Sequence, residues 1–416
     1  MMFFLIVNHA LLFCLFDGVS DSDFFFSQNP IITVAIFPFA IISTWAVIFG
    51  LVSGTANAYN LYLQIDKHKK NLGTRIKHSS YNGIYMLIFH FIFLTFFTHR
   101  IDDGTGIPKV SLITGSIING ELFIPDLMIN LFSDALFYIS FSNLIVNALL
   151  YILWRKEGFK KSKRNFIILI GTVVFWLILT PVLRHTLYPI YIQQANNRNF
   201  FKALFLAWLV GPRHSIFPFV AFAIIGAIFG IAQARNVEIF KIKKYSYSFS
   251  FICFIISLIY FQRDGFPDFG APLLEPSIYM LNASLLILIS AVLIDKVDNN
   301  KPKTQKKIAQ KTVVLRRTSI ASFTIYVLEA PIAASLAKIF NFLFGGDLAN
   351  SALAIGLYFL SLWLIWHLIL RNWSNYNFKY GCEWLNIQIM TKLRGRKSMK
   401  LNIKEILYNP FNLTKS

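Results

Sequence analysis

Long apolar runs separated by short polar segments extend along almost the whole chain. Most of these runs approach the roughly 20 apolar residues that one helical bilayer crossing needs. The expected spans, in chain order, are residues 1–16, 30–52, 81–97, 134–154, 166–183, 215–235, 245–261, 278–294, 319–340 and 352–370. The pattern predicts an all-α fold, a polytopic transmembrane helix bundle of about ten spans over residues 1–370.

The run at residues 215–235, SIFPFVAFAIIGAIFGIAQAR, has no charge before its last residue. Pro218 stands where a helix can begin, because a proline in the first turn removes no helical hydrogen bond. Gly226 and Gly230 are four residues apart, with alanines beside them. Small residues at this spacing allow the backbone of a neighbouring helix to approach closely. We therefore expect this run to be the central packing helix of the bundle.

The polar segments between the runs alternate between strongly basic and nearly neutral. The basic ones are residues 66–78, 155–164, 241–244 and 295–317. Cytoplasmic loops of membrane proteins carry an excess of lysine and arginine, so we assign these segments and both termini to the cytoplasm. Residues 371–416 are expected to form a second unit, a cytoplasmic amphipathic basic tail that lies against the inner leaflet.

Composition agrees with a membrane protein. Hydrophobic residues make up 56% of the chain and charged residues 14%, far from the balance of a soluble domain. The net charge of +20 comes from loops between apolar runs, which favours the lipid bilayer of the cell membrane over nucleic acid as the partner. The three cysteines and the other metal-ligand residue types have no metal-binding spacing, so we expect neither a disulfide nor a metal. A homodimer is left open.

Ionisable residues inside apolar runs are costly and mark functional candidates. Glu329 has no lysine or arginine within a helical turn, so it needs a partner from another helix or must be protonated. It either accepts a proton or binds a cation, or it pairs with a basic residue such as Arg184 or Arg213 as a structural lock. His90 and His367 lie on apolar faces and are expected to be core histidines.

Two cationic pairs, Arg184-His185 and Arg213-His214, stand at the expected external ends of spans. They could bind an anionic acceptor such as a phosphate or a uronate. The alternative is ordinary capping of the membrane interface. Residues 185–213 are expected outside, with an amphipathic helix at 199–210 on the membrane surface.

Several short motifs occur along the chain in a fixed order. They are MFFLIVNH, which ends at Asn8-His9; Phe37-Pro38 with Gly50 to Gly54; DALFYI at 134–139; Phe217-Pro218-Phe219 with Gly226-Ala227 and Gly230; LRRTSIASFTIYVLEAP at 315–331; and FKYGCEW at 378–384. Together they resemble the membrane proteins related to heparan-α-glucosaminide N-acetyltransferase, the YeiB-like proteins and the wider type 3 acyltransferases. The likeness covers most of the apolar part of the chain.

The resemblance implies an acyltransferase that uses acetyl-CoA from the cytoplasm as co-substrate and delivers the acyl group to an acceptor, such as a sugar or glycolipid, on the far side. By position, His9 would be the general base, and Asn8 would hold the developing oxyanion or orient the imidazole. The alternative is that His9 only forms a hydrogen bond to a neighbouring helix. Glu329 stands where the family has histidine and joins the catalytic candidates, and Tyr326 joins the substrate-binding ones. The alternative is a transporter or flippase-like carrier with Glu329 as its coupling carboxylate, although no inverted repeat is visible.

The chain departs from the family pattern at its beginning and near its end. The Asp and Arg-Gly of the family's entry motif are missing ahead of Asn8-His9, and Cys382 replaces the proline of the closing motif. We expect either that the missing part of the entry motif lies upstream of Met1 or that the chemistry has changed.

Overall fold

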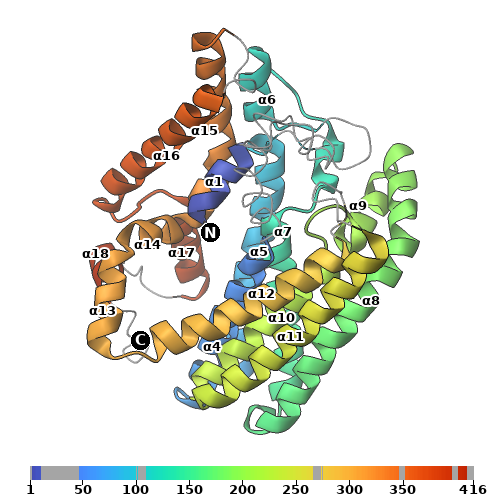
Figure 1. Cartoon of the computed structure of the whole chain (residues 1–416), viewed down its shortest axis with the longest axis vertical. Coiled ribbons are helices and arrows are strands. Elements are labelled where there is room, and N and C mark those ends of the chain that lie inside the picture. Colours follow the sequence, from blue (N-terminus) through green and yellow to red (C-terminus); the bar gives the residue numbers. More distant parts are fainter. Residues whose placement is uncertain are drawn as a thin grey trace.

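The computed structural model describes residues 2–10, 46–99, 101, 109–265, 273, 275–345, 352–395 and 402–409. Every named element within these ranges is helical (Figure 1). The elements of the first half are α1 (Met2–Ala10), α4 (Val47–Asp66), α5 (Leu72–Phe96), α6 (Leu112–Asn119), η3 (Leu127–Leu131), α7 (Ala135–Trp154), η4 (Gly158–Lys160), α8 (Ser162–Asn196) and α9 (Phe200–Val210). Those of the second half are α10 (Ile216–Ala234), α11 (Ile239–Asp264), α12 (Pro276–Leu293), η5 (Ile294–Asp298), α13 (Pro302–Lys311), α14 (Val313–Ile320), α15 (Ser322–Leu343), α16 (Ala352–Ser374), α17 (Cys382–Leu393) and α18 (Ile403–Tyr408).

Eight of the described helices are long and apolar enough to cross a membrane. They correspond to the last eight expected spans and include α5, α7, α8, α10, α11, α12, α15 and α16. The described part of the first expected span is the nine-residue α1, and most of the second expected span lies outside the described residues. The expected total of ten spans and the expected orientation stay predictions.

Several expected helix ends are wrong, and the largest differences are at the ends of α8 and α4. The fifth span was expected to stop at residue 183, but α8 continues through Pro181 and Pro189 to Asn196. A proline removes one helical hydrogen bond, yet long apolar helices tolerate it when neighbours satisfy the released backbone groups. The second span was expected to end at Gly50 to Gly54, but α4 includes both glycines and continues to Asp66.

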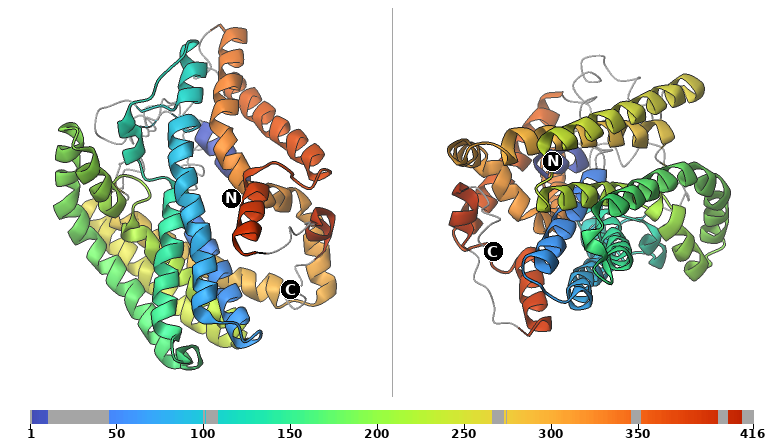
Figure 2. Two further views of the ribbon diagram at one scale, coloured as in Figure 1. Left: turned by 180° about the vertical axis from the view of Figure 1, so that it is seen from behind. Right: turned by 90° about the horizontal axis from the view of Figure 1, so that it is seen from below.

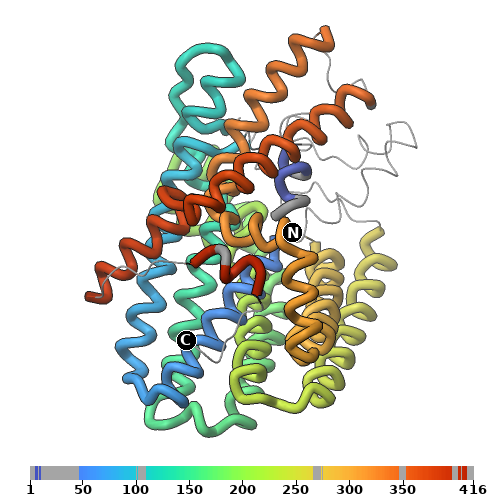
Figure 3. Tube along the Cα trace, turned by 90° about the vertical axis from the view of Figure 1, so that its left-hand side faces the viewer, coloured from blue at the N-terminus to red at the C-terminus, as the bar shows by residue number. Residues whose placement is uncertain are grey.

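The buried apolar side chains form two large clusters. The first surrounds α10 and takes in side chains of α4, α7, α8 and α12. The second joins α1, α5, α15 and α16 with the short helices α17 and α18. In the left view of Figure 2, α5 stands between the helices of the first cluster and the α15–α16 pair, and Figure 3 shows α15 and α16 in its upper half. Side chains that lie between the two apolar clusters are therefore positioned by both of them.

The central helix α10 packs against α4 through the predicted stripe of small residues. A Cβ atom added at Gly226 would overlap the carbonyl oxygen of Leu51, and one at Gly230 would overlap that of Thr55. Gly54 of α4 faces the backbone of α10 at Ala223 in the same way. The two backbones are thus in direct contact, as small residues at a helix interface permit. Phe217 has extended φ/ψ angles, so the regular part of α10 begins at Pro218, as predicted.

Three of the basic turns meet at one end of the bundle (Figure 1). Arg235, just after α10, donates a hydrogen bond from Nη1 to the Tyr62 hydroxyl near the end of α4, at 3.0 Å. It donates another to the carbonyl oxygen of Phe159, between α7 and α8, at 3.3 Å. Because these contacts join the ends of α4, α7 and α10, the beginnings of α7 and α10 lie at the opposite end.

Within the described residues, the last helices pack onto the second cluster, and the expected cytoplasmic tail stays a prediction. Helix α16 runs on to Ser374, and Met390, Ile403 and Leu407 are buried in the second cluster. Glu383 of α17 caps the beginning of α15 (Ser322–Leu343), which has no cap from its own chain segment. Its Oε1 accepts the backbone N–H groups of Phe323 and Thr324 at 2.5 and 3.0 Å, and Oε2 accepts the Thr324 hydroxyl at 2.5 Å.

We expect Glu383→Ala to lower the unfolding temperature, because it leaves two N–H groups at the start of α15 without an acceptor. Losing the partner of a buried donor costs about 1–3 kcal/mol per group. Glu383→Gln keeps one carbonyl oxygen as an acceptor, so its unfolding temperature should fall less than that of Glu383→Ala. Thermal unfolding of the detergent-solubilised protein measures both. The exposed Glu121→Ala serves as the control, and an equal unfolding temperature for Glu383→Ala and Glu121→Ala would show that the cap does not stabilise α15.

Candidate functional site

Six ionisable or hydroxyl side chains gather where α1, α5, α7 and α15 meet. We call this group the polar centre; it consists of His9, His90, His99, Asp134, Tyr326 and Glu329. All except His9 are more than nine-tenths buried, and His9 is partly buried. Buried ionisable groups are expensive unless they pair with one another, so their concentration in an apolar bundle indicates a functional site.

The shortest contact of the polar centre joins the two main catalytic candidates. His9 Nδ1 lies 2.5 Å from Glu329 Oε1, although the residues are 320 positions apart in the sequence. Helix α1 packs along α15, which brings His9 over the face of α15 that carries Glu329. Glu329 thereby obtains the partner from another helix that the sequence requires. Its second oxygen, Oε2, is buried and accepts no hydrogen bond from any described residue.

His99, three residues beyond the end of α5, completes a cluster around the same carboxylate. Its Nε2 lies 3.8 Å from Glu329 Oε1, and its ring stands edge-on to that of His9 at a centroid distance of 5.3 Å. Burial lowers the pKa of His99 below its ordinary value, although the contact with Glu329 raises it in part. Glu329 therefore faces two imidazoles, and in the described residues its ion-pair partners are these two histidines rather than Arg184 or Arg213.

The same three residues could hold a metal ion. One ligand atom from each of His9, His99 and Glu329 lies within 4.8 Å of the others. Two histidines and one carboxylate are a ligand set that binds zinc in enzymes. The expectation of no metal rested on spacing along the chain, which cannot test a site built from three distant segments.

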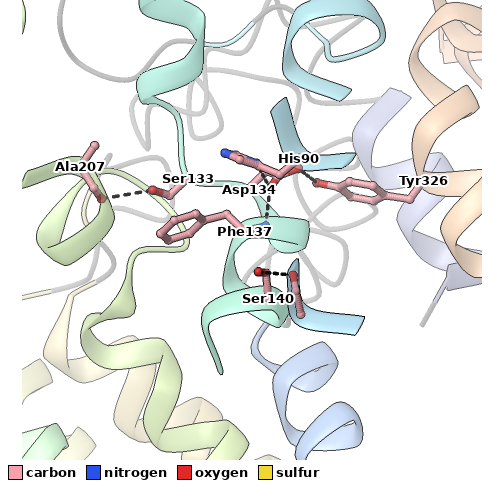
Figure 4. A network of polar contacts seen from close by, with 8 residues as sticks. His90, Ser133, Asp134, Phe137, Ser140, Ala207 and Tyr326 are labelled. Atoms are coloured by element: carbon pink, nitrogen blue, oxygen red, sulfur yellow. Dashed lines mark hydrogen bonds and ion pairs between the residues drawn. The ribbon is translucent and has the colours of Figure 1, made fainter. Parts of the chain in front are cut away.

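A second network reaches the polar centre from the other side. Asp134 is the N-cap of α7 and accepts the Phe137 backbone N–H at 2.8 Å through Oδ1. The same oxygen lies 2.6 Å from His90 Nδ1, and Oδ2 accepts the Tyr326 hydroxyl at 3.3 Å. Figure 4 shows Asp134 bridging between His90 and Tyr326. Tyr326 and Glu329 are three residues apart on α15, so one helix face connects the two networks.

Arg213-His214 lies beside this second network. The His214 backbone N–H donates to the Ser133 carbonyl oxygen at 3.2 Å, and Ser133 also donates its hydroxyl to the Ala207 carbonyl oxygen at 3.1 Å (Figure 4). These bonds fix His214 next to Asp134. Burial lowers the pKa of His214 to about 4, so its imidazole is neutral at neutral pH. The structure thus brings one of the two predicted cationic pairs close to the polar centre.

The other predicted pair is placed differently. Arg184 is buried inside α8 and donates from Nε to the Phe217 carbonyl oxygen at 2.9 Å and from Nη2 to the Ser215 hydroxyl at 3.1 Å. These hydrogen bonds attach the beginning of α10 to α8, so Arg184 has a structural role. His185 is exposed on α8. The side chain of Asn8 lies outside what the structure describes, so its expected part in the site stays a prediction.

Sequence reasoning missed three members of the polar centre. His99 was not singled out, Asp134 was interpreted only as the start of a span, and His90 was taken for a core histidine. All three are ionisable residues in or at the ends of apolar spans, the same signal that identified Glu329. His90 is indeed paired, but its Nε2 is buried without a hydrogen-bond partner in the described residues.

Known proteins neither support nor contradict the predicted resemblance. No protein-family model, no curated protein and no solved structure matches the chain. The functional argument therefore rests on the geometry of the polar centre and on the sequence.

Proposed function

We propose that this protein is an integral membrane acyltransferase that moves an acyl group, with acetyl-CoA as donor, to a sugar, glycolipid or other envelope acceptor. The observation that carries the proposal is the partly buried 2.5 Å contact between His9 Nδ1 and Glu329 Oε1. A histidine held by a carboxylate is a common arrangement of a general base, because the carboxylate fixes the ring and stabilises the imidazolium that forms.

In the proposed reaction, His9 donates its Nδ1 proton to Glu329 in a hydrogen bond and receives the acceptor's proton at Nε2. The acceptor oxygen or nitrogen then forms a bond to the thioester carbonyl carbon, and the carbon–sulfur bond breaks. The CoA thiolate leaves with the electron pair of that bond and takes the proton from His9. The products are the acylated acceptor and free CoA, so no further reactant is needed. General-base help of this kind contributes about 10²–10⁴-fold to a rate.

The basic turns support one orientation in the membrane. The end of the bundle where Arg235 joins the basic turns would face the cytoplasm of the cell, and the beginnings of α7 and α10 would face outward. Arg213 and His214 would then lie on the acceptor side, where a cation and a neutral imidazole suit an anionic or hydroxyl-rich acceptor. Tyr326 lies between this side and His9, at a ring-centroid distance of 6.2 Å from His9.

Transfer of label from acetyl-CoA tests the proposal. Membranes that contain the protein should incorporate radioactive acetyl groups, and His9→Ala should reduce incorporation by about 100-fold or more. His68→Ala is the matched control, because His68 is an exposed histidine in the turn before α5. Equal incorporation by the wild type and His9→Ala would refute the role of His9 as base.

The same assay addresses the metal alternative. If His9 is a base, treatment with a chelator should leave incorporation unchanged. If His9, His99 and Glu329 bind zinc, the purified protein should contain about one zinc per chain, which each single substitution removes.

A carrier without acyl chemistry is the second candidate, and the His90–Asp134–Tyr326 network favours it. Chains of buried ionisable and hydroxyl groups are also the structures through which coupled transporters move protons. A carrier would incorporate no label in any variant, and its transport of a solute would depend on the proton gradient. The absence of label from the wild type under saturating acetyl-CoA would therefore favour this candidate.

A further inference from the structure

His9, His99 and Glu329 present three metal-ligand atoms to one point of the polar centre. One ligand atom from each residue lies within 4.8 Å of the others, and no second group of histidine, cysteine or acidic side chains in the described ranges gathers in this way. The three residues come from α1, from the segment after α5 and from α15, so the fold itself assembles the group. Two imidazoles and a carboxylate suit zinc, whereas Mg²⁺ and Ca²⁺ prefer oxygen ligands alone.

The charge of Glu329 favours a cation at this point. Its side chain is 1% exposed, and its ion-pair partners among the described residues are two imidazoles, which carry a charge only when they bind a second proton. Buried charges are stable only when they are paired or when they coordinate a metal. Oε2 of Glu329 accepts no hydrogen bond from any described residue, so the carboxylate can turn toward a metal without giving up another contact. A divalent cation would supply the positive charge that two neutral imidazoles lack.

The distances between the three side chains need only a small adjustment to hold zinc. Zinc binds histidine nitrogen and carboxylate oxygen at about 2.0–2.2 Å, which places neighbouring donors of a tetrahedral site about 3.4 Å apart. His9 Nδ1 lies 2.5 Å and His99 Nε2 lies 3.8 Å from Glu329 Oε1, so each separation has to change by less than about 1 Å. The side chain of His9 is 19% exposed, which leaves its ring room to move and gives an ion a route to the buried carboxylate.

We infer that His9, His99 and Glu329 bind one zinc ion and that this zinc blocks acyl transfer. A zinc ion on His9 Nδ1 takes the place of the proton that His9 shares with Glu329. The one proton of the neutral imidazole is then on Nε2, the atom that has to receive the acceptor's proton, so zinc-bound His9 cannot act as the base. The binding of zinc needs no acyl chemistry, whereas the inhibition rests on the proposed function.

Equilibrium dialysis of zinc against the full-length protein in detergent, after a chelator has removed bound metal, tests the site. The wild type should bind about one zinc per chain. His99→Phe keeps a ring without its nitrogens and should weaken zinc at least about 100-fold, because the loss of even an outer-shell partner of a metal costs about 10–100-fold. The exposed His68→Ala is the matched control and should bind as the wild type does. Zinc-edge X-ray absorption of the wild type, which needs no variant, should show two imidazole ligands.

Transfer of label from acetyl-CoA tests the inhibition. Zinc that fills the site should stop transfer by the metal-free wild type, and a chelator should restore it. Whatever rate His99→Phe retains without metal should persist at the same zinc concentration. The comparison is the ratio of transfer with zinc to transfer without zinc within each variant, so a lower basal rate of His99→Phe does not affect it.

The two measurements separate the zinc site from acyl transfer. Wild-type protein that binds zinc no more tightly than His99→Phe, or a zinc edge without imidazole ligands, would overturn the site and leave acyl transfer standing. Zinc binding that leaves transfer unchanged, or transfer that requires zinc, would overturn the inhibition. If metal-free wild type transfers no label while zinc binds in the expected pattern, the zinc site stands and the proposed acyl transfer fails.

Discussion

Replacing Glu329 by glutamine is expected to lower acyl transfer by about 10²–10⁴-fold while the protein stays folded. The amide oxygen of glutamine can still accept the His9 Nδ1 proton, so the contact between α1 and α15 survives. The neutral amide cannot stabilise the imidazolium that forms when His9 takes the acceptor's proton. Glu329→Gln removes one partner of a buried charged contact, so the unfolding temperature should fall, and label transfer is therefore compared per amount of folded protein.

The measurements are label transfer and thermal unfolding on the same preparation. The His9–Glu329 contact could instead serve only to hold α1 against α15. In that case label transfer per molecule of folded Glu329→Gln protein would equal that of the wild type. Ser335→Ala, an exposed hydroxyl on α15 that bonds to the Pro331 carbonyl oxygen, controls for a change on the same helix. If His9 and Glu329 act as a unit, the double variant His9→Ala with Glu329→Gln should transfer label only slightly more slowly than His9→Ala alone.

The order and positions of the eight described apolar helices could be predicted because hydropathy is a property of each local run. The eight candidate spans coincide with expected runs, and α7 begins at the residue after Asp134, as the sequence indicates. The ends of the helices were harder to predict than their positions. The end of α8 was expected at residue 183, just before Arg184-His185, but the helix continues to Asn196. It includes Pro181 and Pro189, which an apolar helix tolerates when packing compensates the lost hydrogen bonds.

The candidate site could be predicted only as separate residues. The cost of an ionisable group in an apolar run identified Glu329, whereas His9 was identified by its position in the family resemblance. Their pairing depends on α1 packing along α15, which is a tertiary contact between the two ends of the chain. The link from Glu383 to the start of α15 is likewise tertiary, because its donors lie about 60 residues earlier in the sequence.

The second large effect concerns the fold rather than the chemistry. Gly226→Leu is expected to abolish accumulation of folded protein, because the Cβ alone would overlap the Leu51 carbonyl oxygen of α4. A backbone atom cannot move aside as a flexible side chain can, so α4 and α10 would have to separate along their whole seam. Overpacking a tight interface costs about 1–3 kcal/mol and sometimes more, and here the neighbouring Gly54 and Gly230 contacts would be lost as well.

Gly171→Leu provides the matched control, since a Cβ at Gly171 meets no heavy atom within 4 Å. The same substitution there should leave stability unchanged or raise it by up to about 1 kcal/mol, because leucine favours a helix more than glycine does. Size-exclusion elution and thermal unfolding of detergent extracts measure both variants. A Gly226→Leu protein that elutes as a single species and unfolds with the wild type would mean that α4 and α10 are not in backbone contact. The unfolding temperature of Gly226→Ala should lie between those of the wild type and Gly226→Leu, because alanine introduces the overlapping Cβ without the larger side chain.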